Sequence, residues 1–181
     1  MELLVSFGIA VLIIGASLVF FATTQFSLSH TEALISGEEQ ARRALSRITN
    51  ELRLSSAYHV NIYNVSGTSD NLIGDAISFQ VPVGSYGDEI YLSGSLTIAW
   101  GSNSTADNSI IYALADNTTL MRQESDGINA ISSVVLARNI KSLIFQRPSV
   151  DSNQITIQIE VQGDASLNVT RAIKSSVSLR N

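Results

Sequence analysis

The chain begins with a long apolar run that gives way to a polar, amphipathic stretch. Residues 3–22 carry no charged side chain, and Glu2 stands directly before them. Twenty residues at about 1.5 Å each make a helix of roughly 30 Å, the thickness of a bilayer's hydrocarbon core. A cleaved secretory signal, the alternative, needs a preceding basic residue and a shorter apolar stretch. The pattern predicts a membrane-spanning helix over residues 1–22.

The helix is expected to continue through residues 23–57 with only one apolar side. Glu38 and Glu39 each precede an arginine by four positions, an order that supports an exposed helix face. Gly37 is the expected weak point or bend. A helix with one apolar face packs that face against another part of the protein, most simply the domain that follows. The residues expected to make this helix packing stripe are Leu34, Ala41, Leu45, Ile48 and Leu52.

Residues 58–181 have the texture of strands and turns. QITIQIEV alternates cleanly, so one face of this strand is expected to be buried, and ADNTT at 115–119 is expected to form a hairpin. The fold class is therefore α+β, a long N-terminal helix packed on an antiparallel β-sheet domain. The expected strands are YHVNIY, AISFQV, SLTIAW, SIIYAL, TTLMRQ, SVVLA, SLIFQR and QITIQIEV.

Composition and charge remove several function classes. The net charge is −5, whereas nucleic-acid binding requires clustered Lys and Arg, so no direct nucleic-acid partner is expected. The chain has no cysteine, which excludes disulfide scaffolds and thiolate metal sites.

No constellation of catalytic or metal-binding residues is found, so we assign no catalytic residue, cofactor or metal, and no enzyme activity. His30 and His59 lie outside any triad or metal-ligand spacing. Tyr86 and Trp100 are interpreted as core or edge aromatics. Asp- and Asn-rich loops could bind calcium through oxygen but lack EF-hand spacing, and turns favour these residues anyway. These loops lie at 107–108, 116–117 and 151–153.

The segment ELLVSFGIAVLIIGASLVFF resembles the N terminus of type IV pilins and pseudopilins, in which a glutamate opens a long hydrophobic helix. The following ARRALSRITNELRLSSA resembles the amphipathic helix of minor members of that superfamily. The later segments look like the J-type minor pseudopilin of type II secretion and the W-type minor type IV pilins. These segments are IIYALADNTTLMRQESDG, SVVLARNIKSLIFQR, ITIQIEV and RAIKSSVSLRN.

The resemblance implies a structural subunit that helps prime, cap or assemble a pilus or secretion filament. Its partners would be other pilin or pseudopilin subunits, the inner membrane and prepilin peptidase. The β domain would lie on the periplasmic or extracellular side. Partner subunits of a tip complex are expected to pack through Leu45, Ile48 and Leu52.

Glu2 has two interpretations. In pilins the corresponding carboxylate is buried on assembly and pairs with the N-terminal amine of a neighbouring subunit, which fits the cost of burying an unpaired charge. The alternative is an interfacial acid at the headgroup level.

The family's precursors carry a short basic leader before the mature chain, whereas here Met1 directly precedes Glu2. Either the sequence starts inside the mature protein or this member departs from the pattern. Leader processing and N-methylation are thus implied by the resemblance alone. The alternative function is a membrane-anchored tip adhesin or binding module displayed on a pilus-like filament.

Overall fold

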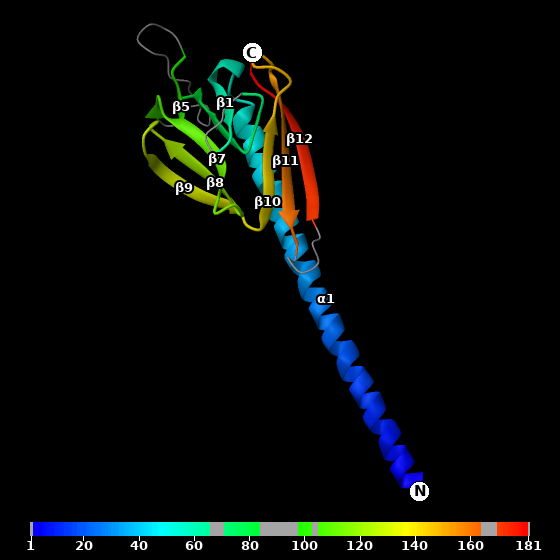
Figure 1. The fold of residues 1–181 in the computed structure, drawn as a ribbon. Coiled ribbons are helices and arrows are strands. Elements are labelled where there is room, and N and C mark those ends of the chain that lie inside the picture. The colour runs from blue at the N-terminus through cyan, green and yellow to red at the C-terminus, as the bar shows by residue number, and fades with distance from the viewer. Residues whose placement is uncertain (1, 66–70, 84–97, 103–104, 164–169, 181) are drawn as a thin grey trace.

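One long helix and two main antiparallel sheets organise the chain in the computed structural model (Figure 1). The helix α1, Glu2–Leu52, has 51 residues, and its N-terminal part extends far beyond the β domain. The structure describes residues 2–65, 71–83, 98–102, 105–163 and 170–180.

A short 3-10 helix, η1, Ala57–His59, links α1 to the strands. In chain order the strands are β1 Val60–Tyr63, β2 Ile73–Gly74, β3 Ala76–Phe79, β4 Val81–Pro82, β5 Trp100–Ser102, β6 Thr105–Ala106, β7 Ser109–Ala115, β8 Thr119–Ser125, β9 Ala130–Ala137, β10 Ile140–Gln146, β11 Gln154–Gln162 and β12 Thr170–Ser178.

The strands form a five-stranded sheet in the order β1-β3-β7-β8-β9 and a four-stranded sheet in the order β12-β11-β10-β2. A small third sheet has the order β4-β5-β6. All pairings between these strands are antiparallel. The predicted α+β class with antiparallel sheets is thus confirmed.

The predicted hairpin joins β7 to β8, where Ala115 pairs with Thr119. Asp116 and Asn117 at its tip have φ angles of 50° and 56°, the left-handed conformation that a type I′ turn requires. Asp and Asn adopt this conformation at lower cost than other residues with a side chain. This explains why these polar residues stand between two apolar strands.

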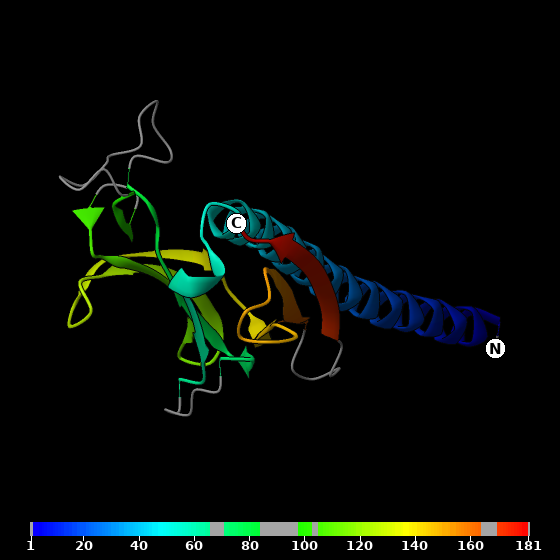
Figure 2. The same cartoon turned by 90° about the horizontal axis from the view of Figure 1, so that it is seen from above.

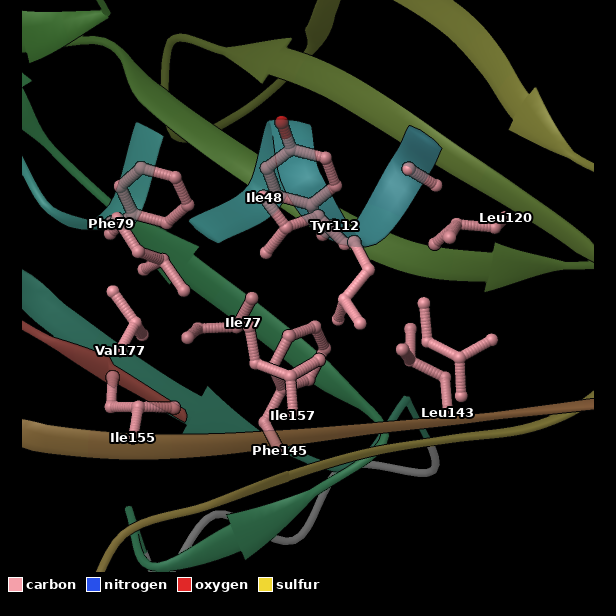
Figure 3. Close-up of a cluster of buried hydrophobic side chains, with 14 of the residues drawn as sticks. Ile48, Ile77, Phe79, Tyr112, Leu120, Leu143, Phe145, Ile155, Ile157 and Val177 are labelled. Carbon is pink, nitrogen blue, oxygen red and sulfur yellow. The ribbon is translucent and has the colours of Figure 1, made fainter. Parts of the chain in front are cut away.

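The core lies where the inner faces of the two larger sheets meet α1 (Figures 2 and 3). The helix packs against β9, β11 and β12. Strand β11 is buried on the predicted alternate residues. Its Ile157 pairs with Phe145 of the adjacent strand β10, and Tyr112 of β7 lies across the core in the other sheet. The fully buried residues of β11 are Ile155, Ile157, Ile159 and Val161.

The helix ends at Leu52, so the expectation that it reaches Ala57 was wrong. The N–H of Arg53 still bonds the carbonyl of Thr49, but those of Leu54 and Ser55 bond carbonyls only three residues back. The carbonyl of Ser55 then accepts the N–H of Arg180 at 2.7 Å. A bond to the C-terminal segment therefore replaces the next helical turn.

Gly37 does not bend the helix, which continues through it. The residue is buried, and a Cβ atom there would lie 2.9 Å from Cγ1 of Val161 on β11. Real Cβ contacts are not this short. The glycine therefore allows helix and sheet to approach closely, and the expected weak point is a packing site.

The sequence pattern did not predict strand β12, which the structure contains. Its central residues Lys174, Ser175 and Ser176 lack an apolar alternation. The strand lies at the edge of its sheet, where polar and charged side chains are common. Of SLTIAW, residues 95–97 lie outside the described residues, and Trp100 begins β5.

Gly37→Leu is expected to lower the free energy of unfolding by about 1–3 kcal/mol, because the side chain overpacks the contact with Val161. Thermal unfolding of the full-length protein in detergent, followed by circular dichroism, measures this. Gly8→Leu is the control, since nothing lies within 4 Å of a Cβ there. In a Val161→Ala background, which removes the close contact, Gly37→Ala should raise the free energy of unfolding by up to about 1 kcal/mol, because alanine favours the helix more than glycine does. Equal effects of the two leucine substitutions would contradict the packing role.

Candidate functional site

The N-terminal half of α1 projects away from the β domain (Figures 1 and 2). Its segment Ser6–Gln25 spans 20 residues, and none of its described side chains is buried against the rest of the chain. This helix is long and apolar enough to cross a membrane. The exposed large apolar side chains are Phe7, Val11, Leu12, Ile13, Ile14, Leu18, Val19, Phe20 and Phe21.

Hydroxyl groups within this segment are satisfied by the helix itself. Ser17 donates to the carbonyl of Ile13 at 2.8 Å, and Thr24 donates to that of Phe20 at 2.8 Å. Thr23 donates to the same turn of the helix. An apolar environment penalises an unpaired hydroxyl, so these bonds make the segment suited to lipid or to a packed helix bundle.

Gly8 and Gly15 lie on the protruding helix with no atom within 4 Å of a Cβ built at either position. Their surfaces are thus free for another helix to approach closely. Glu2 is the first residue of α1, and its side chain lies outside the described part of the chain. Its role in assembly stays a prediction.

The apolar stripe in the second half of α1 lies inside the protein's own core. Ala41, Ile48 and Leu52 are fully buried, Leu45 is 7% exposed, and Leu34 is half-buried. The expectation that partner subunits pack through Leu45, Ile48 and Leu52 was therefore wrong. The two sheets already cover these side chains.

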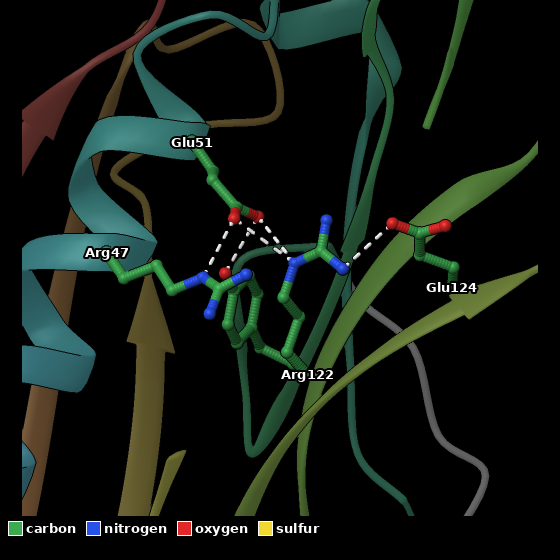
Figure 4. Close-up of polar contacts among 5 residues, drawn as sticks. Arg47, Glu51, Arg122 and Glu124 are labelled. Atoms are coloured by element: carbon green, nitrogen blue, oxygen red, sulfur yellow. Dashed lines mark hydrogen bonds and ion pairs between the residues drawn. The ribbon is translucent and has the colours of Figure 1, made fainter. Parts of the chain in front are cut away.

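A buried polar cluster joins the end of α1 to the five-stranded sheet (Figure 4). The Glu51 carboxylate accepts the Tyr112 hydroxyl at 2.8 Å and Nε of Arg122 at 3.0 and 3.1 Å. Arg47, one helical turn earlier, donates its Nε to Glu51 at 3.1 Å. Arg122 also donates to Glu124 at 2.9 Å. Each charge in the cluster is therefore paired.

Burial and charge shift the titration of this cluster. Burial raises the pKa of the Tyr112 hydroxyl far above its ordinary value of 10.0, and the Glu51 carboxylate beside it raises it further. Burial alone would lower the pKa of the Arg122 guanidinium, but its two carboxylate neighbours outweigh burial and raise it. Tyr112 is thus held neutral and Arg122 charged at physiological pH.

A second buried cation, Arg147, fixes the chain where it leaves the helix. Its guanidinium donates to the carbonyls of Asn71 at 2.6 Å, Ala57 at 3.3 Å and Val60 at 3.3 Å. Burial lowers the pKa of Arg147, and Asp151 partly opposes this shift. Three main-chain oxygens therefore take the place of a carboxylate partner.

The described histidine and loop residues that were weighed as catalytic or metal-binding candidates have structural roles. His59 contacts the Gln80 side chain through Nδ1 at 3.1 Å and stacks on Trp100 with ring centroids 4.1 Å apart. The side chain of His30 and all of Tyr86 lie outside the described part of the chain. Asp107, Asp116 and Asn117 of the candidate calcium loops have positive φ angles, so they serve the turns. No group of three or more metal-ligating His, Cys, Asp or Glu side chains occurs among the described residues.

Sequence reasoning missed Glu51, Tyr112, Arg122 and Arg147. One signal was present: Glu51 lies between Ile48 and Leu52, next to the apolar stripe, where a charged residue requires a partner. Its partner could not be found in the same way, because Arg122 is 71 positions away. The buried cluster therefore depends on the tertiary fold.

No family model matches this chain, and no curated protein or solved structure matches it significantly.

Glu51→Ala is expected to lower the free energy of unfolding by about 3–5 kcal/mol, because it leaves the Arg122 charge buried without its main partner. Chemical denaturation of the full-length protein in detergent measures the loss. The matched control is Glu39→Ala, which removes an exposed helical pair with Arg43 and should cost at most about 1 kcal/mol. Similar losses in both variants would contradict the role of the buried cluster.

The Tyr112 hydroxyl is expected to make the free energy of unfolding decrease as the pH rises in the alkaline range. Its folded-state pKa is raised, so its stabilising effect is full below the unfolded value near 10.0 and is lost as the pH rises above it. Tyr112→Phe is expected to lower stability by about 1 kcal/mol at pH 7, through the lost hydrogen bond, and to flatten the decline above pH 10. Unfolding free energies between pH 8 and 11 test this. Tyr58→Phe, at a residue 91% exposed, should leave the decline unchanged.

Proposed function

We propose that this chain is a minor pilin or pseudopilin, a structural subunit that helps prime, cap or assemble a type IV pilus or a type II secretion filament. The observation that carries the proposal is the division of α1 into two halves. One half completes the core of a β domain, and the other projects with its described large apolar side chains exposed. A filament subunit requires both halves of the helix: one holds the β domain that is displayed, and the other is buried in lipid or among the helices of other subunits.

The projecting half is suited to two environments of similar polarity. Before assembly it would span the inner membrane, with the β domain on the periplasmic or extracellular side. After assembly it would pack with the helices of other pilin or pseudopilin subunits. Gly8 and Gly15 support this second state, because small residues permit close helix contacts.

The resemblance adds prepilin peptidase as the processing partner and N-methylation as the modification that follows cleavage. In a packed helical filament, Glu2 would be removed from water. A buried carboxylate is tolerated when it is paired with a cation such as the amino terminus of a neighbouring subunit. The need for that pair would set the register between subunits.

Glu2→Ala is expected to leave membrane insertion unchanged and to impair incorporation into filaments. Fractionation of source cells into membrane and sheared filament material, followed by immunoblotting, measures both quantities. The matched control is Glu32→Ala, which removes an exposed carboxylate further along the same helix. Normal incorporation of Glu2→Ala would overturn the assigned role of Glu2.

A further inference from the structure

Strand β9 forms one edge of the five-stranded sheet, and its outer side is open. Among the residues that the structure describes, β9 pairs only with β8, and no hydrogen bond reaches its other side. Adjacent residues of an antiparallel strand direct their N–H and C=O groups to opposite sides, so half of these groups in β9 point away from the sheet. A row of unpaired main-chain groups is a template for another extended chain.

The other edges of the two larger sheets have features that hinder pairing. Strands β1 and β2 are short, with four and two residues, and β12 carries Arg171 and Lys174. Short strands and charged side chains are common means of protecting an open edge. In contrast, β9 has eight residues, and residues 127–137 contain no charged residue and no proline. Strand β9 therefore lacks these protections.

Both faces of β9 are exposed along most of its length. Its first six residues are all exposed, and Ile131, Val134 and Val135 among them are 58%, 44% and 43% exposed. Figure 2 shows β9 on the outside of its sheet, with α1 near one of its ends. Exposed apolar side chains that lie together mark interaction surfaces. An added strand with apolar side chains would bury them.

A groove of about 400 Å³ lies where β9 approaches α1, and its charged lining is entirely basic. The cations are Arg43, Arg47 and Arg138. The first two pair with carboxylates of their own helix, Glu39 and Glu51. Arg138 is exposed directly after β9 and has no ion-pair partner within the described part of the chain. This end of the open edge thus favours a carboxylate.

We propose that the open edge of β9 binds an extended strand of another polypeptide, which adds to the five-stranded sheet. Main-chain hydrogen bonds to β9 hold the strand, and its apolar side chains cover Val134 and Val135. A carboxylate at the end near α1 pairs with Arg138. The inference goes beyond the proposed filament function, because this surface does not involve the projecting half of α1.

The ends of β9 distinguish this partner from a second copy of the strand. An antiparallel pair of copies would bring the turn at residues 126–129 towards the groove. The Asp126 carboxylate in that turn already accepts the N–H groups of Ile128 at 2.9 Å and Asn129 at 2.6 Å. A parallel, in-register pair would place the two Arg138 charges together. The occupant is therefore a different strand that stays extended past β9 and carries its own carboxylate.

Two synthetic peptides test the charge preference. The probe is the fluorescein-labelled peptide Glu-Thr-Val-Thr-Val-Thr-Val-Thr-Glu with blocked ends, whose two glutamates serve either strand direction. The second peptide has lysine in place of both glutamates. Fluorescence anisotropy with the full-length protein in detergent, with empty micelles as the blank, should show about tenfold tighter binding of the glutamate peptide. Arg138→Glu should reverse this preference, whereas Arg53→Glu, at an exposed arginine outside the groove, should not.

Proline substitutions test whether the peptide uses the open edge. Ser132 and Ser133 are neighbours in the regular part of β9, so the N–H of one points towards β8 and that of the other points away. Proline removes the N–H group. The variant that loses the outward N–H should keep most of its thermal stability and bind the glutamate peptide about tenfold more weakly. The other variant should lower the unfolding temperature, because it breaks the pairing with β8.

Failure of both peptides to bind, equal affinity for the two, or binding that neither proline weakens would overturn the proposal. A dimer of the unsubstituted chain that the outward proline abolishes would also overturn it, because a second copy would then occupy the edge. None of these outcomes bears on Glu2→Ala, whose effect on incorporation tests the proposed function separately.

Discussion

The structure depends on the packing of one helix stripe into the gap between two sheets. Ile48 and Leu52 are fully buried where the inner faces of the five-stranded and four-stranded sheets meet. Without the helix, the apolar residues of both faces would be open to water at a cost of about 1.5–3 kcal/mol for each large side chain. Because the stripe belongs to the same helix as the projecting half, the position of the core determines where the exposed segment begins. The close contact at Gly37 marks the approach of this helix to β11.

Apolar packing alone leaves the helix free to slide or rotate among similar arrangements. The Glu51 cluster removes that freedom, because its carboxylate meets Tyr112 and Arg122 at distances that only one register provides. Buried ion pairs contribute little net stability, and their best-attested use is to select one arrangement. Arg147 acts in the same way on the segment after the helix, where it binds three carbonyl oxygens. The two arginines thus define how the helix and the strands that follow it are joined.

Local patterns in the sequence were enough to predict the long helix, its stripe and the alternating strand β11, because each depends on residues a few positions apart. The order of strands was not predictable, since it depends on which sheet edges meet. Strand β12 was missed because an edge strand tolerates polar residues such as Ser175 and Ser176. Gly37 was interpreted as a weak point because its neighbour Val161 lies 124 positions away. The partner of Glu51 was hidden for the same reason.

The burial of the stripe changes which surfaces remain for assembly. The apolar stripe in the second half of α1 is covered by the chain's own sheets, so in the proposed filament it would not be available to neighbouring subunits. Nine large apolar side chains are exposed among the described residues of Ser6–Gln25, which makes this segment unfavourable in water by roughly 10–20 kcal/mol. Lipid and a bundle of similar helices both relieve this cost, and because they do so about equally, apolar burial alone does not drive transfer from one to the other. In the proposed filament, polar and charged contacts would then be required to favour the assembled state, and this is the role that we propose for Glu2.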